Sequence, residues 1–202
     1  AESTAYVNSR IFPLDSIWSE HGALDVSNYC YRSYDNAIRT MFGDPKTAKE
    51  YADNAQFLSA DGYRAMFEAA NHRMWDITSG VMIWKINSCW PDVCWQIYDW
   101  YLAPNASYYF ARKAMEPVHV QLNDNDFKIS VITASHRVLD DVKVTAKVIN
   151  NDMRVAWQHS QQLTVSPDCY KEIITVPQHG KYSYNYFVKL ELHDKAGKLL
   201  SE

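Results

Sequence analysis

Tryptophan is the residue type whose number and spacing most suggest chemistry in this sequence. Five of the seven tryptophans fall between Trp75 and Trp100. Flat indole rings stack on the apolar faces of sugars, so this density is typical of a carbohydrate site. Aromatic side chains also dominate hydrophobic cores, and composition leaves a tryptophan-rich core open as the alternative.

Other kinds of site have less support. The four cysteines lack the paired spacing of a zinc site, and we expect them to be free thiols, with a Cys89–Cys94 disulfide as the alternative. The sequence shows neither a glycine-rich phosphate loop nor a cluster of metal ligands, so we expect no cofactor and no metal. The net charge is −4 without any basic run, which argues against nucleic-acid and membrane partners.

The first part of the chain has the period of helices. Apolar residues recur every three or four positions, as one face of a helix requires. Ser27 is the expected N-cap of the first helix, Gly43-Asp44-Pro45 its stop, and Pro104 the start of the last helix. The predicted elements are a helix within 25–45, a helix over 47–75, a buried strand over 81–86, a loop over 87–95 and a helix over 104–116.

From Val118 onward the apolar period changes from 3.6 to 2. Alternating apolar residues predict strands within 118–122, 127–131, 142–148, 153–157 and 184–192, with turn residues between them. Several half-buried strands at this spacing indicate an antiparallel sandwich. We therefore predict two domains, residues 1–117 and residues 118–202.

The predicted strand at 81–86 raises a difficulty, because a single strand cannot satisfy its own backbone. A helix–strand–loop–helix order is typical of the end of a (β/α)₈ barrel. Substrate-facing residues then lie just after the strand, at its C-terminal end. Asn87, Trp90 and Trp95 are the residues at that position.

A long stretch of these residues resembles glycoside hydrolase family 2, at the last barrel strand, the last helix and the entry to the following sandwich. The likeness is to exo-β-glucosaminidases and endo-β-mannosidases, and Trp18 and His21 followed by a tyrosine-rich helix fit the same subgroup. The Asn87-Ser88 pair favours the glucosaminidase-like branch. The residues that carry the resemblance are Gly80, Trp84, Asn87, Trp90, Trp95, Asp99, Tyr108, Tyr109 and Glu116-Pro117-Val118-His119.

The resemblance implies an α+β multidomain fragment: the end of a (β/α)₈ barrel, mostly helical here, followed by an immunoglobulin-like β-sandwich. Enzymes of the family are retaining and use two glutamates, one of which follows an asparagine. None of the eight glutamates of this chain follows asparagine, and Glu20 only imitates the nucleophile motif. We therefore expect no catalytic residue in this chain and no activity from the chain alone.

What the resemblance leaves to this chain is the wall of a sugar site. Trp84 is the expected platform under the sugar, with a barrel-core role as the alternative. Asn87 is expected to bond a sugar hydroxyl or a loop, and Trp90 and Trp95 to contact sugar. Asp99 and His21 are expected to support the site, Asp99 by bracing the loop.

The predicted function is thus a fragment of a retaining β-glycoside hydrolase for glucosaminides or mannosides. The alternative is a carbohydrate-binding or interaction module built on the sandwich. Expected partners are a β-glycoside and the remaining segments of the parent enzyme, and a polysaccharide-degrading parent favours a periplasmic or secreted location. We also expect the sandwich to lack its last strand, and the chain to self-associate or to exist only with other segments.

Overall fold

The structure, a computed structural model, describes residues 25–87, 96–178 and 180–202. The chain divides into two compact units. Unit 1 holds the described residues up to Ala65 together with those of Met82–Lys113, and unit 2 holds Met66–Val81 and Ala114–Glu202. Unit 2 thus includes residues 66–81, whereas the domain limits drawn from the sequence, 1–117 and 118–202, stay a prediction. No helix in the described part of the chain is long and apolar enough to cross a membrane.

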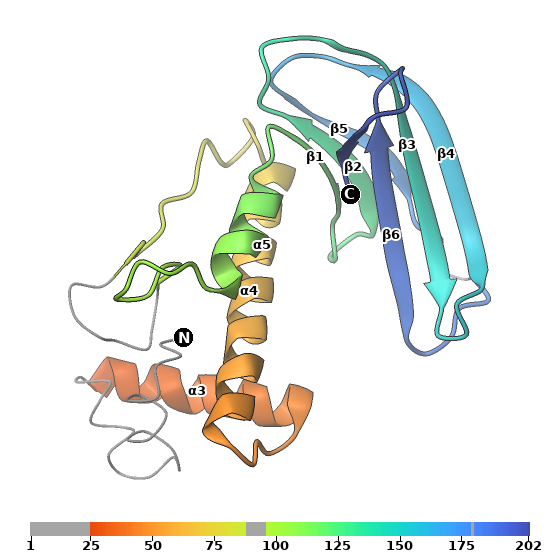
Figure 1. The fold of residues 1–202 in the computed structure, drawn as a ribbon. Coiled ribbons are helices and arrows are strands. Elements are labelled where there is room, and N and C mark those ends of the chain that lie inside the picture. The colour runs from red at the N-terminus through yellow and green to blue at the C-terminus, as the bar shows by residue number, and fades with distance from the viewer. Residues whose placement is uncertain (1–24, 88–95, 179) are drawn as a thin grey trace. The chain divides into compact units, whose positions relative to one another are not determined.

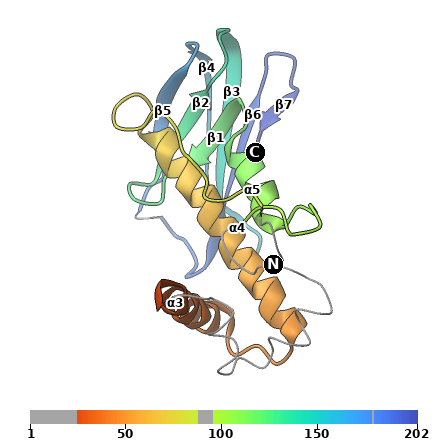
Figure 2. The ribbon, with the colours of Figure 1, turned by 90° about the vertical axis from the view of Figure 1, so that its left-hand side faces the viewer.

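Two of the predicted helices are α3 (Asp25–Phe42) and α4 (Ala48–His72), and α4 runs as one continuous helix (Figure 2). The end of α3 is a glycine cap, because Gly43 has a φ of 81° and donates its N–H to the Arg39 carbonyl at 2.9 Å. The start of α4 is capped by Thr47, whose hydroxyl accepts the Glu50 N–H at 3.1 Å. Local capping residues therefore set both helix boundaries.

The third helix, α5 (Ala106–Ala114), lies beside α4 in both ribbon views (Figures 1 and 2). It begins after Asn105, not at Pro104 as predicted, because the Asn105 side chain accepts the Ser107 N–H at 3.0 Å. The Ser107 and Ser59 hydroxyls, 3.0 Å apart, hold its first turn to α4.

The predicted strand over residues 81–86 is wrong. These residues do not form a strand, and the alternate side chains Met82 and Trp84 are 97% and 80% exposed. The sequence pattern was that of a strand, but a ladder needs a neighbour to accept and donate its hydrogen bonds. Among the described residues no strand pairs with this segment, so it does not join a sheet.

Unit 2 contains two antiparallel sheets (Figure 1). One has the strand order β1-β2-β5 and the other the order β4-β3-β6-β7. The alternating pattern predicted β1, β2, β3 and β6, but only residues 155–157 of β4, and it missed β5. Leu199-Leu200, after the turn at Asp194, was expected to begin a hairpin's second strand, which is β7. The strands are β1 (Val118–Leu122), β2 (Lys128–Thr133), β3 (Leu139–Asn150), β4 (Val155–Val165), β5 (Cys169–Thr175), β6 (Tyr186–His193) and β7 (Leu199–Ser201).

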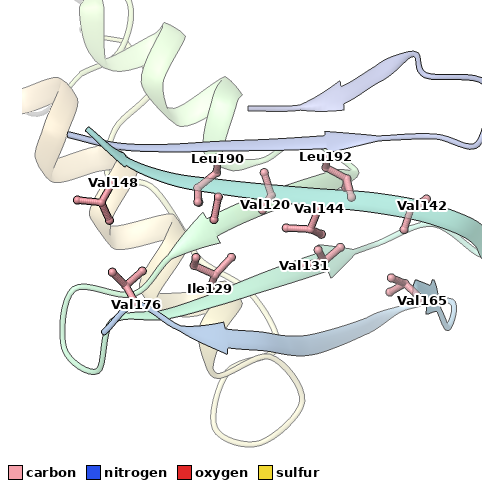
Figure 3. Close-up of a cluster of buried hydrophobic side chains, with 11 residues drawn as sticks. Val120, Ile129, Val131, Val142, Val144, Val148, Val165, Val176, Leu190 and Leu192 are labelled. Carbon is pink, nitrogen blue, oxygen red and sulfur yellow. The ribbon is translucent and has the colours of Figure 1, made fainter. Parts of the chain in front are cut away.

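A single aliphatic core joins the two sheets of unit 2 (Figure 3). It contains every second residue of β3 and the facing residues of the other strands. Each buried valine or leucine contributes about 1.5–3 kcal/mol to folding, so the period-2 pattern is what holds unit 2 together. The fully buried members are Val120, Ile129, Val131, Val142, Val144, Ala146, Val148, Val165, Val176 and Leu192.

The last turns of α4 belong to unit 2 and are attached to it by polar contacts. The Gln121 side-chain amide of β1 donates to the Glu68 carbonyl at 2.8 Å, and the Asn71 amide donates to the Ala114 carbonyl at 3.0 Å. The Trp75 indole N–H donates to the Asp168 carbonyl at 3.2 Å. The first two bonds hold the end of α4, and the third holds the segment that follows it.

Candidate functional site

The candidate site lies in unit 1, where the segment after Val81 presents large apolar side chains to solvent. Met82, Trp84 and Ile86 alternate along it and are 97%, 80% and 55% exposed. The residues between them are half-buried. An exposed run of this kind is unusual for a folded protein and marks a surface that meets a ligand or another part of a protein.

Backbone bonds anchor the far end of this segment. The Ile86 carbonyl accepts the N–H groups of Ile97 and Tyr98 at 3.1 and 3.0 Å. Asn87, the next residue, has an exposed side chain and takes part in an interaction of its own. The peptide bond between Trp84 and Lys85 is cis. Trp84 and Asn87 are therefore carried by a segment with a defined attachment point.

Asp99 organises the turn that follows. Its side chain is 7% exposed and its Oδ1 accepts the Ala103 N–H at 2.9 Å. Its own N–H donates to the Ala103 carbonyl at 3.0 Å. With both bonds directed to the same residue, Asp99 braces the turn, and Trp100 and Tyr101 at its tip are 42% and 66% exposed.

Trp100 and Tyr101 were not among the candidates chosen from the sequence. The sequence holds no signal that marks them, because the burial of Asp99 and the turn that it closes are visible only in the structure. Helix α5 adds Tyr108 and Tyr109 to the aromatic residues of unit 1. The centroid of the Tyr108 ring lies 5.1 Å from that of Tyr98 and 5.2 Å from that of Tyr109. A hydrogen bond with Tyr108 raises the pKa of Tyr98.

Three predicted site residues lie outside the described residues. They are Trp90 and Trp95 in the loop and His21 near the start of the chain, and Glu20 lies there too. The structure describes Trp84, Asn87 and Asp99, with the first two exposed and the third buried. Their role in binding a sugar stays a prediction.

Unit 2 contains a second cluster of reactive side-chain types. The ring of His119 lies between two carboxylates: its Nε2 is 3.1 Å from Glu68 and its Nδ1 is 3.4 Å from Glu116. The Ser201 hydroxyl donates to Glu116 at 2.7 Å, lies 3.3 Å from Nδ1 and accepts the Val120 N–H at 3.2 Å. A serine, a histidine and a glutamate in contact have the composition of a hydrolytic triad.

This cluster does not have the access that catalysis needs. His119 is 0% and Ser201 2% exposed, so a substrate carbonyl cannot reach the hydroxyl. The hydroxyl is also committed to Glu116 and to a backbone N–H. The cluster therefore joins β7, β1 and the end of α4, and the sequence analysis did not predict these partners of His119. None of the described residues forms a group that could hold a metal ion.

Comparison with other proteins links the chain to β-glycoside hydrolases, although no family model matches it. An exo-β-D-glucosaminidase of Streptomyces avermitilis is 29% identical over 200 residues, which cover 93% of this chain and 22% of the relative. A mannosylglycoprotein endo-β-mannosidase of Lilium longiflorum is 31% identical over 179 residues, which cover 87% of this chain and 18% of the relative. The chain spans about a fifth of the length of these relatives.

Solved structures give the same result. The exo-chitosanase CsxA of Amycolatopsis orientalis has a TM-score of 0.76 and 28% identity, over 82% of this chain and 20% of the enzyme. A β-D-mannosidase of Dictyoglomus thermophilum has a TM-score of 0.76 over 84% of this chain and 21% of the enzyme, but at 18% identity it speaks for the fold alone. The mixed α/β fold described above is thus shared with exo-glucosaminidases and mannosidases.

Proposed function

Because this chain belongs to glycoside hydrolase family 2, we propose that it forms part of the sugar-binding wall of a retaining β-glycoside hydrolase. The substrates we propose are β-linked glucosaminides or mannosides, the compounds named for its relatives. The observation that carries the proposal is Trp84, an 80% exposed indole on an anchored segment of the matched stretch. An exposed, positioned indole offers a flat apolar face to a pyranose ring.

The fold supports two further parts of the proposal. The order of helix α4, a connecting segment, a turn and helix α5 is compatible with the end of a (β/α)₈ barrel, and we propose that Trp84 and Asn87 lie at its ligand-facing end. The described residues of unit 2 form seven antiparallel strands in two sheets around one core, an arrangement compatible with an immunoglobulin-like sandwich. We propose that this sandwich is a structural neighbour of the barrel.

The two catalytic carboxylates belong, in this proposal, to the remaining segments of the parent enzyme. Retaining hydrolysis needs one carboxyl group to donate a proton and a second to attack the sugar. Glu68 and Glu116 are bound to a buried histidine, and Glu50 accepts the Lys46 N–H at 2.7 Å at the start of α4. The chain alone then binds sugar weakly and does not cleave it.

Saturation-transfer NMR with glucosamine and mannose oligosaccharides tests the proposal on the whole chain. We expect Trp84→Ala to abolish the transfer. Trp75→Ala is the matched control, since it removes an indole that is 60% exposed but lies in unit 2, and it should leave the transfer unchanged.

Two results would contradict the proposal. Transfer that survives Trp84→Ala would move the binding site away from this segment. If deletion of the residues before Val118 also spared it, the binding-module alternative on the sandwich would be favoured. Turnover of an aryl β-glycoside by the chain, removed by Glu20→Gln, would overturn the assignment of the catalytic residues to other segments.

A further inference from the structure

The strand β4 is an open sheet edge without the usual protection. It is the end strand of the order β4-β3-β6-β7, as Figure 1 also shows, and no strand among the described residues pairs with its outer side. Natural edge strands are short, charged or interrupted by proline, which prevents pairing with another chain. β4 has 11 residues, VAWQHSQQLTV, and none of them is charged or proline. Most of its side chains are exposed.

The sequence of β4 is also symmetric in character about its central residue, Ser160. In an antiparallel pairing of β4 with itself, Ser160 would face Ser160 of the second copy and each residue before it would face the residue equally far behind it. Like then meets like along the whole strand. The facing pairs are Val155 with Val165, Ala156 with Thr164, Trp157 with Leu163, Gln158 with Gln162, and His159 with Gln161.

The regular part of the pairing between β4 and β3 is also centred on Ser160. This pairing is regular from Trp157 to Leu163 and irregular on both sides of that stretch. Ser160 is the middle of the regular stretch. The flat, regular part of the edge is therefore the part over which a second strand can add in continuous register.

We propose that β4 pairs with β4 of a second copy of this chain, antiparallel and centred on Ser160. The two four-stranded sheets then form one continuous sheet across a twofold axis. On the core side, Trp157 of one copy packs on Leu163 of the other and extends the hydrophobic layer. On the outer side, Gln158 and Gln162 meet across the axis, and amide side chains can bond to each other in both directions.

The expected dimer is weak and reversible. A single strand edge buries less surface than the standard interface of a stable complex. One acceptor near the end of the edge is already occupied, since Lys171 Nζ donates to the Thr164 carbonyl at 2.7 Å. The lack of charge on β4 means that two copies approach without repulsion.

Charge pairs placed at the facing glutamines test both the interface and its register. In Gln158→Lys/Gln162→Lys, lysine faces lysine at two places across the axis. In Gln158→Glu/Gln162→Lys, glutamate faces lysine at both places. Both positions are exposed and lie on one face of β4, so circular dichroism should show the same fold for both variants.

Sedimentation velocity of the full chain over a wide concentration range provides the readout. We expect wild type to dimerise reversibly, the dilysine variant to dissociate, and the glutamate–lysine variant to dimerise at least as tightly as wild type. The dilysine variant places two like-charged pairs across the axis, and the glutamate–lysine variant places two oppositely charged pairs there. The Kd of the dilysine dimer should therefore be about tenfold or more above that of the glutamate–lysine dimer. A mixture of the dilysine variant with Gln158→Glu/Gln162→Glu should dimerise again. A monomeric wild type, or association that is equal in all variants, would overturn the proposal.

Discussion

Removal of one buried hydroxyl group should destabilise unit 2 more than its size suggests. Ser201, 2% exposed at the end of β7, accepts the Val120 N–H at 3.2 Å and donates to Glu116 at 2.7 Å. β1 and β7 belong to different sheets, so this side chain bonds one sheet to the other. The perturbation is Ser201→Ala, which deletes the oxygen and leaves the backbone unchanged.

The magnitude follows from which partner water can reach. The Glu116 side chain is 27% exposed, so water can replace part of the lost bond there. Val120 is 1% exposed, and its N–H loses an acceptor that water cannot replace. A buried donor without a partner costs about 1–3 kcal/mol, and a bond to a charged group contributes about 1.5–3 kcal/mol. Allowing for hydration of Glu116, we expect a loss of about 2–3 kcal/mol of unfolding free energy.

The assay is native-state hydrogen exchange by NMR, which resolves unit 2 from unit 1. The slowest amides of β3 report the unfolding free energy of unit 2, and the Val120 amide reports the lost bond directly. Ser160→Ala on β4 is the matched control, since its hydroxyl lies on an exposed face 3.1 Å from Thr145. It should cost less than about 0.5 kcal/mol. Equal effects of the two substitutions, or an unchanged exchange rate at Val120, would refute the reasoning.

Three further predictions concern single side chains. Burial raises the pKa of Tyr34 from 10.0 to about 12, so stability contributed by its neutral form should be lost as pH rises through that interval, and Tyr34→Phe should flatten the alkaline unfolding curve. A Cβ at Gly180 would overlap the ring of Tyr182, which packs against the core. Gly180→Ala should therefore reduce the unfolding free energy by about 1–3 kcal/mol, seen as a lower melting temperature. Burial raises the pKa of the Cys169 thiol, whose Sγ donates to the Ser166 carbonyl at 3.1 Å, so mass spectrometry should show slower alkylation at neutral pH than in the unfolded chain.

The sequence predicted those elements whose boundaries and faces are decided locally. Helices α3 and α4 are bounded by residues that act within one turn, Gly43 and Thr47. Strand β3 places every second residue in the core, so its period is visible without any tertiary knowledge. Strand β5 was missed because its apolar residues Ile173 and Ile174 are adjacent, and its pairing with β2 has a register irregularity.

The parts that could not be predicted depend on partners far away in the chain. The segment 81–86 has the pattern of a strand, but whether it becomes one depends on neighbours that the local pattern does not contain. The same limit applies to His119, whose carboxylate partner Glu68 lies 51 residues earlier and whose contact Ser201 lies 82 residues later. Asp99, by contrast, bonds four residues ahead and closes the turn to Ala103, whereas its predicted bracing of the loop over 87–95 stays a prediction.

The motif Glu116-Pro117-Val118-His119 contributed to the resemblance with a hydrolase family, yet its residues do not form a binding surface. The side chains of Glu116 and His119 both make contacts inside unit 2, where they join β1 to β7 and to the end of α4. Loss of His119 would leave the carboxylates of Glu68 and Glu116 without this partner at mostly buried positions, which is costly whatever the protein binds. Likeness at these positions therefore reflects the folding of unit 2. Trp84 and Asn87, members of the same resemblance, keep exposed side chains, and they are the residues on which a test of sugar binding should concentrate.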